Sequence, residues 1–189
     1  YHFMKLVEKN FLLYKLLNSS FTGLSIGIVF IIYKPLDPSV YSIGGMVMTI
    51  LMLVVAAFYK RLLNIKNFFQ ISILVEVIML LTLIVFLIFD AGLTVALLIF
   101  CGYQLTFIFG GYLVRAETLV AHDKHLLSKI DVLKQIGYLV GLGLSFLFYK
   151  SLEYGFEISD DYDRIRILHY FLIALQSTII FLVIRSFKK

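Results

Sequence analysis

Six apolar runs, each of about twenty residues, recur along the 189-residue chain, and only short polar connections separate them. A bilayer core about 30 Å thick is crossed by about 20 helical residues, because each residue advances a helix by about 1.5 Å. The runs therefore predict an all-α polytopic membrane protein, with one six-helix transmembrane domain over residues 1–189. The predicted spans are residues 11–33, 41–59, 68–89, 92–114, 132–152 and 167–187. Asp90-Ala91-Gly92 predicts a tight turn between the third and fourth spans.

The composition agrees with a chain that lies mostly in lipid. Hydrophobic residues make up 61% of the sequence and charged residues 15%, against about 45–50% and about 25% in soluble domains. The net charge of +5 would suit a nucleic-acid partner. However, the basic residues sit at the ends of the spans rather than along one face, which indicates membrane orientation instead. The predicted environment is the lipid bilayer, and no nucleic-acid partner is expected.

Lys and Arg are distributed unequally between the two sides of the predicted bundle. With alternating spans, thirteen of the 17 Lys and Arg residues fall on the side of both termini. Short cytoplasmic loops are rich in Lys and Arg. We therefore predict that both termini are cytoplasmic and that the protein is integral to a membrane, expected to be the bacterial inner membrane.

Glu76 is the acidic residue placed deepest in a predicted span. It lies about 12 Å along the third span, where a charged side chain is costly unless it faces protein or water. One interpretation is a proton- or cation-coupling site. The other is a structural role, either as a protonated carboxyl group bonded to a neighbouring helix or in a buried ion pair. Arg115 of the neighbouring fourth span is the predicted partner in such a pair.

Polar side chains on the first and fourth spans predict a substrate-binding surface. Lys15, Asn18, Ser19, Thr22 and Ser25 form one polar stripe at helical spacing on the first span. Such a stripe either lines an aqueous cavity or packs tightly on another helix. The fourth span carries Tyr103 and Gln104 at membrane depth. The candidate substrate-binding residues are therefore Asn18, Thr22, Tyr103 and Gln104.

Small residues at four-residue spacing predict two helix-packing faces. One comprises Ser19, Gly23 and Gly27 on the first span, and the other Gly137 and Gly141 on the fifth. Small-xxx-small spacing lets two helix backbones approach closely in a membrane. These residues are therefore expected to hold helices together.

Motifs for catalysis or cofactor binding are weak in this sequence. His122-Asp123-Lys124-His125 is a poor zinc signature without further ligands. Asp160-Asp161-Tyr162-Asp163 lacks the glycine and glutamate of a calcium loop and reads as a solvated acidic loop. No phosphate-binding loop or nucleophile motif is present. We expect no metal, no cofactor and no enzymatic activity.

Two short motifs and the layout of the spans resemble one six-helix half of a major facilitator superfamily transporter. In that family the loop after the second helix carries G-x-L-a-D-R-x-G-R-K. The corresponding stretch here is residues 57–66, in which Arg61 matches the motif arginine and Lys60 stands in the place of the acid. The Gly137-xxx-Gly141-x-Gly143 run is similar to the glycine pattern of the family's fifth helix, without its proline.

The resemblance implies a fold and a function. In the family, the first and fourth helices line the cavity, and a full transporter has two six-helix halves with the substrate between them. This implies a half-size transporter that moves a small solute by alternating access, working with a second copy or with another six-helix half. The resemblance also places Lys60 and Arg61 in a gating loop. Proton coupling is one form of this mechanism.

Two other functions fit a six-helix membrane protein of this length. One is the substrate-binding subunit of an energy-coupling-factor importer, which would dock on a partner through Ser19, Gly23 and Gly27. The other is a membrane scaffold that transports nothing. Copurification with a cytoplasmic ATPase would favour the importer subunit.

Overall fold

The computed structural model describes residues 4–89 and 92–188 as a bundle of helices. Within these residues, six segments are helical and apolar enough to cross a bilayer, as the sequence predicts. They comprise α1 (Glu8–Ile32), α2 (Pro38–Ala57), α4 (Ile65–Ile88), α5 with α6 (Leu93–Ile108 and Gly110–Ala121), α7 (Lys124–Gly155) and α8 (Asp161–Arg185). A single-turn helix, α3 (Tyr59–Leu62), joins α2 to α4. The tight turn predicted at Asp90-Ala91 lies outside the described residues.

Four of the helices begin at a side chain that caps the first turn. Asp37, Asn64, Asp123 and Asp160 each accept a hydrogen bond from a backbone N–H of the following turn. Such caps satisfy amide groups that have no partner within the helix. At Asp37, the hydrogen bonds from Ser39 also lower the pKa of the carboxyl group.

These caps correct two loops predicted from the sequence. Asp123 starts α7 at Lys124, so the connection left between the fourth and fifth predicted spans, residues 115–131, shrinks to His122 and Asp123. Asp160 starts α8 at Asp161, so the predicted acidic loop is instead the first turn of a helix. Acidic residues are favourable there, because the N-terminal end of a helix carries partial positive charge.

The fourth span is divided at Phe109. The Phe109 N–H donates to the carbonyl of Thr106, three residues back, and Gly110 and Gly111 follow. Glycine is about 1 kcal/mol less favourable than alanine in a helix, which makes this a weak point. The span therefore consists of α5 and a separate shorter helix, α6.

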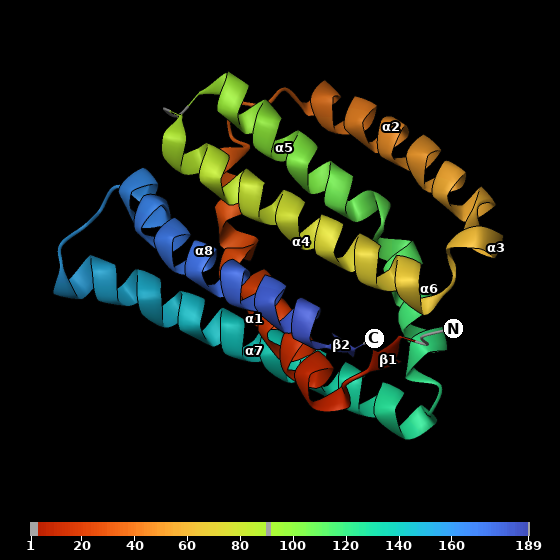
Figure 1. Ribbon diagram of the computed structural model, residues 1–189. Helices are drawn as coiled ribbons and strands as arrows, with labels where there is room; N and C mark the ends of the chain where they lie inside the picture. Colours follow the sequence, from red (N-terminus) through yellow and green to blue (C-terminus); the bar gives the residue numbers. More distant parts are fainter. Residues whose placement is uncertain (1–3, 90–91, 189) are drawn as a thin grey trace.

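The helices pack in two related groups (Figure 1). α1 packs on α7 and α8, and α5 packs in the corresponding way on α2 and α4, while α4 and α8 pack on each other. In order along the chain, the first span thus contacts the fifth and sixth, and the fourth contacts the second and third. The two three-span halves of the chain therefore have equivalent contacts.

The two ends of the described chain lie side by side (Figure 1). β1 (Lys5–Leu6) pairs antiparallel with β2 (Phe187–Lys188), and the Val7 N–H donates to the Ser186 carbonyl at 2.8 Å. The Phe187 ring packs against those of Phe11 and Phe68. Both ends are therefore on one side of the molecule, as an even number of crossings requires.

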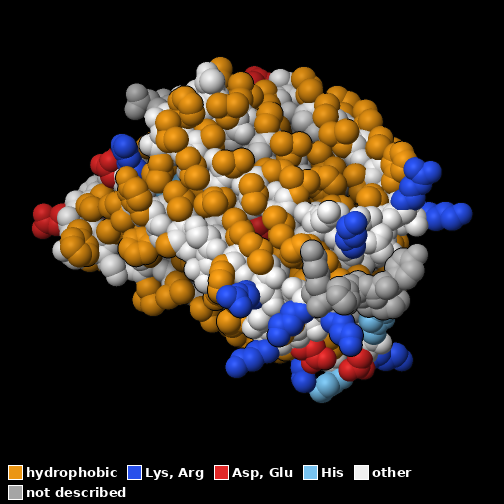
Figure 2. All heavy atoms as spheres, viewed as in Figure 1, with side chains coloured by type: hydrophobic (Ala, Val, Ile, Leu, Met, Phe, Trp, Pro, Cys, Tyr) orange, Lys and Arg blue, Asp and Glu red, His pale blue; other side chains and the backbone are white. Residues whose placement is uncertain are grey.

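The surface separates apolar and charged regions. Figure 2 shows hydrophobic side chains over most of the visible face, with Lys and Arg gathered at the end where the termini lie. None of the α2 residues Pro38–Ala57 is buried, and that helix contains no charged residue. An outer surface of this kind fits a lipid environment.

Candidate functional site

Glu76 of α4 is at the centre of a buried hydrogen-bond network. Its Oε1 accepts from the Tyr14 hydroxyl and from Asn18 Nδ2, both at 2.9 Å, and its Oε2 accepts from Gln176 Nε2 at 2.7 Å. Tyr14 and Asn18 lie on α1 and Gln176 lies on α8. One carboxylate thus joins three helices, and each donor that it binds is electrically neutral.

The hydrogen bonds of Gln176 determine which way its amide group points. Its Nε2 donates to Glu76 Oε2 and also to the Glu76 backbone carbonyl at 2.9 Å. A flipped amide would place an oxygen against two acceptors, so this orientation is the favourable one. It leaves Gln176 Oε1 buried without a hydrogen-bond partner.

A second network lies nearby and consists of ion pairs around one buried carboxylate. Glu117 of α6 forms ion pairs with Lys15 of α1 and with Lys134 of α7, the latter at 2.9 Å. The side chains of Lys15 and Glu117 are 10% and 4% exposed. This network ties α6 to the two long helices beside it.

The prediction of an ion pair between Glu76 and Arg115 is wrong. Arg115 is exposed, and it takes part in none of the ion pairs found among residues 4–89 and 92–188. On α6 the side chain two positions further on, Glu117, faces inward instead. The prediction chose the wrong residue of α6, because Glu117 and not Arg115 is on the buried face of that helix.

A small cavity of about 240 Å³ lies beside both networks. Glu76, Gln176 and Lys15 line it, together with Asn18 and Thr22 of the polar stripe. Its other polar and aromatic lining residues are Tyr14, Phe21, Ser25, Tyr103, Thr106 and Phe107. The stripe predicted on the first span therefore borders a cavity rather than only a helix contact.

Three of the four predicted substrate-binding residues share this cavity. They are Asn18, Thr22 and Tyr103. Gln104 lies one step further along α5, where it borders two adjoining cavities nearer the Tyr33 end of α1. Its Oε1 is buried and has no hydrogen-bond partner.

Five residues of the two networks were not among the predicted site residues: Tyr14, Lys15, Glu117, Lys134 and Gln176. Lys15 does belong to the polar stripe, and Gln176 is a polar residue near the middle of its span. The position of both within apolar runs therefore indicated a buried polar contact. The rotation of each helix about its own axis, which places them opposite Glu76 and Glu117, is not visible in the sequence.

The predicted packing faces meet at the contact of α1 with α7. A Cβ at Gly23 would lie 2.8 Å from the Leu142 nitrogen, and Cβ atoms at Gly137 and Gly141 would collide with backbone oxygens of α1. Ser19 belongs to the same contact, through its Cβ. Gly27 differs, because a Cβ there would meet nothing within 4 Å.

The remaining predicted site residues, Lys60 and Arg61, are exposed on α3. The Arg61 carbonyl accepts hydrogen bonds from the side chains of Asn64 and Asn67, which fixes the entry to α4. A gating role for these two residues stays a prediction.

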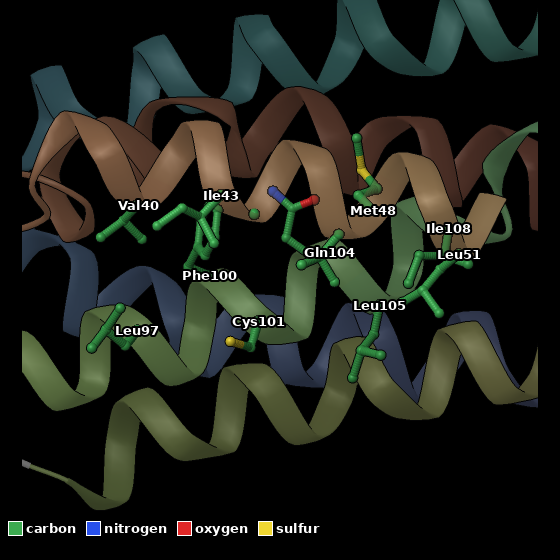
Figure 3. A pocket seen from close by; sticks show the side chains of 12 residues that line it. Val40, Ile43, Met48, Leu51, Leu97, Phe100, Cys101, Gln104, Leu105 and Ile108 are labelled. Carbon is green, nitrogen blue, oxygen red and sulfur yellow. The ribbon is translucent and has the colours of Figure 1, made fainter. Parts of the chain in front are cut away.

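A larger hollow of about 410 Å³ separates α2 from α5 (Figure 3). Its walls are almost entirely apolar and include Met48, Leu51 and Phe100, while Gln104 is the polar member. The two helices are in close contact at Gly44, where a Cβ would lie 2.5 Å from the Phe100 ring. Figure 3 shows Gln104 extending toward α2.

Comparison with known proteins gives no relative. No protein-family model matches the chain, and no curated protein or solved structure matches it. Function is therefore argued from the geometry above.

Proposed function

We propose that this chain is a half-size transporter that resembles one half of a major facilitator and moves a small solute by alternating access. The observation that carries the proposal is the polar cavity at membrane depth, which places a buried carboxylate, Glu76, beside Asn18, Thr22 and Tyr103. Ionisable groups inside a membrane mark substrate or ion pathways. The proposal includes a location in the bacterial inner membrane with both termini in the cytoplasm.

The packing of the helices supports the same function. The equivalent contacts of the first and fourth spans correspond to two three-helix repeats of opposite direction, the arrangement within each half of such transporters. In this arrangement the first and fourth helices border the substrate, and α1 and α5 border the cavity here. α6 could then move relative to α5 at Phe109, while Glu117 holds it to α1 and α7.

The cavity also explains why we propose a dimer. Thr22 and Phe107 line the cavity and are exposed at its outer edge. A polar cavity that opens toward lipid is unfavourable, because lipid offers its polar groups no hydrogen-bond partner. A second six-helix unit, related by a twofold axis along the membrane normal, would cover this edge. Cysteines at Thr22 should crosslink between copies, and a strictly monomeric active protein would exclude this assembly.

Alternating access is tested by the side from which the cavity can be reached. In a Cys101→Ser background, Thr22→Cys should react with membrane-impermeant thiol reagents added from either side of a sealed vesicle. Ser177→Cys is the matched control, since Ser177 is an exposed hydroxyl residue in α8 outside the cavity and should react from neither side. Labelling of Thr22→Cys from one side alone would reject transport and favour a scaffold.

The importer-subunit alternative is less well supported by the geometry. Docking through the first helix would require Gly23 to be free, but its face is covered by α7. Recovery of a stable complex with a cytoplasmic ATPase would reverse this preference.

A further inference from the structure

The two buried networks differ in how their charges are balanced. Lys15 and Lys134 share Glu117, and each lies in an ion pair. Glu76 is 4% exposed and forms no ion pair with any residue of the described ranges 4–89 and 92–188. Its partners are one hydroxyl and two amides. A buried carboxylate without a counter-charge is costly, so it either takes up a proton or favours a cation that enters the cavity beside it.

The three aliphatic hydroxyl groups that line the cavity already donate their hydrogen atoms to backbone carbonyls. Thr22 donates to the Asn18 carbonyl, Ser25 to the Thr22 carbonyl and Thr106 to the Tyr103 carbonyl, at 3.2, 3.4 and 2.7 Å. A hydroxyl that donates elsewhere can only accept from a ligand.

Gln176 adds a further acceptor to the same wall. Its side chain is fully buried, it lines the cavity, and its Oε1 has no partner in a network that fixes the amide orientation. Together with Glu76, this wall suits a ligand that is both positively charged and rich in N–H donors.

The aromatic residues indicate an organic cation rather than an inorganic one. Rings of Tyr14, Phe21, Tyr103 and Phe107 line the cavity, and aromatic faces attract organic ammonium groups. At about 240 Å³ the cavity is smaller than the roughly 300–1,000 Å³ of drug-sized sites. Lys15, the cationic lining residue, is held by Glu117 and so leaves Glu76 available.

We propose that the cavity binds a small primary ammonium compound, with its N–H groups on Glu76 and Gln176 and with its ammonium group and the adjoining alkyl carbons against the aromatic rings. This inference rests on the proposed function, because it names the class of solute that the proposed transporter would carry.

The proposal is tested by calorimetric titration of the protein in lipid nanodiscs, in an amine-free buffer, with empty nanodiscs as the blank. Three probes of equal carbon number and different charge are compared: n-propylammonium, propionamide and propionate. n-Propylammonium should bind at least about 10-fold more tightly than propionamide, as a charge-assisted hydrogen bond is worth about 1.5–3 kcal/mol. Propionate should not bind.

Variants then assign the binding to this cavity. Glu76→Gln should weaken n-propylammonium binding about 10- to 100-fold, whereas Glu153→Gln, which alters an exposed carboxylate of α7, should leave it unchanged. Tyr103→Leu removes a ring without touching the Glu76 network and should weaken binding about 3- to 30-fold. Tyr103→Phe keeps the ring and should bind normally. The Tyr103 pair keeps the test decisive if Glu76→Gln fails to fold.

Three results would overturn the proposal: equal affinity for n-propylammonium and propionamide, preferential binding of propionate, or binding that Tyr103→Leu leaves unchanged. Sodium ions that bind more tightly than n-propylammonium would instead make this an inorganic cation site and also reject the proposal.

The titration needs neither transport nor two-sided access. Ammonium binding with one-sided labelling of Thr22→Cys would therefore reject transport alone, and two-sided labelling without ammonium preference would reject the solute class alone.

Discussion

At the scale of single residues, Glu76 shows how one side chain positions three helices. Its two oxygens hold Tyr14, Asn18 and Gln176, which come from the first and last spans. Each of these donors loses a hydrogen-bond acceptor if the carboxylate is removed. The carboxylate therefore satisfies the hydrogen-bond donors of its neighbours, just as they satisfy its two oxygens.

Replacing Glu76 by leucine should cost more stability than replacing it by glutamine, although leucine is the better residue for a membrane. Leucine removes the acceptor of two buried donors, Tyr14 and Gln176, each at about 1–3 kcal/mol, and of the half-buried Asn18 amide. Glutamine keeps an oxygen for Tyr14 and Asn18. Thermal unfolding in nanodiscs shows which of the two variants is less stable. Ser177→Leu, at an exposed site on α8, should change stability by less than about 0.5 kcal/mol. A Glu76→Leu protein as stable as Glu76→Gln would mean that the network contributes little.

Lys15 and Glu117 should show strong energetic coupling. Glu117→Gln leaves Lys15 buried without its partner, at a cost of about 3–5 kcal/mol, and the cost should be much smaller when Lys15 is already methionine. A double-mutant cycle on unfolding free energies measures this difference. Arg115→Gln serves as the control, because Arg115 is exposed, and it should stay within about 0.5 kcal/mol of wild type. Additive losses at Lys15 and Glu117 would contradict the pairing.

At the scale of helices, the contact of α1 with α7 depends on missing side chains. Gly141 lies against the Ser20 backbone oxygen, whereas nothing lies within 4 Å of the Cβ position of Gly143, two residues further along. The two glycines therefore differ in role although they are neighbours on one helix.

Alanine substitutions at these two glycines should have opposite effects. Gly141→Ala forces α1 and α7 apart and should destabilise the protein by about 1–3 kcal/mol. Gly143→Ala should be neutral or stabilising by up to about 1 kcal/mol, since alanine is the better helix former. The pair can be compared by thermal unfolding under identical lipid conditions. Equal losses at both positions would show that glycine is not needed for close packing here.

The sequence predicts the six spans well, because hydropathy is summed over about twenty residues and tolerates local error. It also places Asn18, Thr22 and Tyr103 at one cavity, since a polar stripe within an apolar run can only face protein or water. It does not predict that Glu76 meets Gln176, 100 residues away, as this depends on the rotation of two helices. The Arg115 prediction failed for the same reason: the inward face of α6 is set by packing beyond the Phe109 break.

At the scale of the whole molecule, the orientation of the bundle can be measured directly. Single cysteines at Lys66 and Lys124, in the Cys101→Ser background, should react only with reagents that reach the cytoplasm, and one at Asp160 should react only from outside. The unequal distribution of Lys and Arg gives the physical reason. Whole-cell labelling with an impermeant maleimide, before and after permeabilisation, provides the measurement. Reaction of Lys124→Cys and Asp160→Cys from the same side would contradict the topology.

The pairing of β1 with β2 has a consequence for how the chain can be connected. Since Lys5 lies opposite Lys188, a short linker can join the two ends, and the six helices then form a closed circuit with no natural starting point. The circuit can be reopened at Ser159, in the connection between α7 and α8, without cutting a helix. The resulting circular permutant keeps every helix contact but begins on the opposite side of the membrane. It thus separates the order in which the helices are synthesised from the structure that they form.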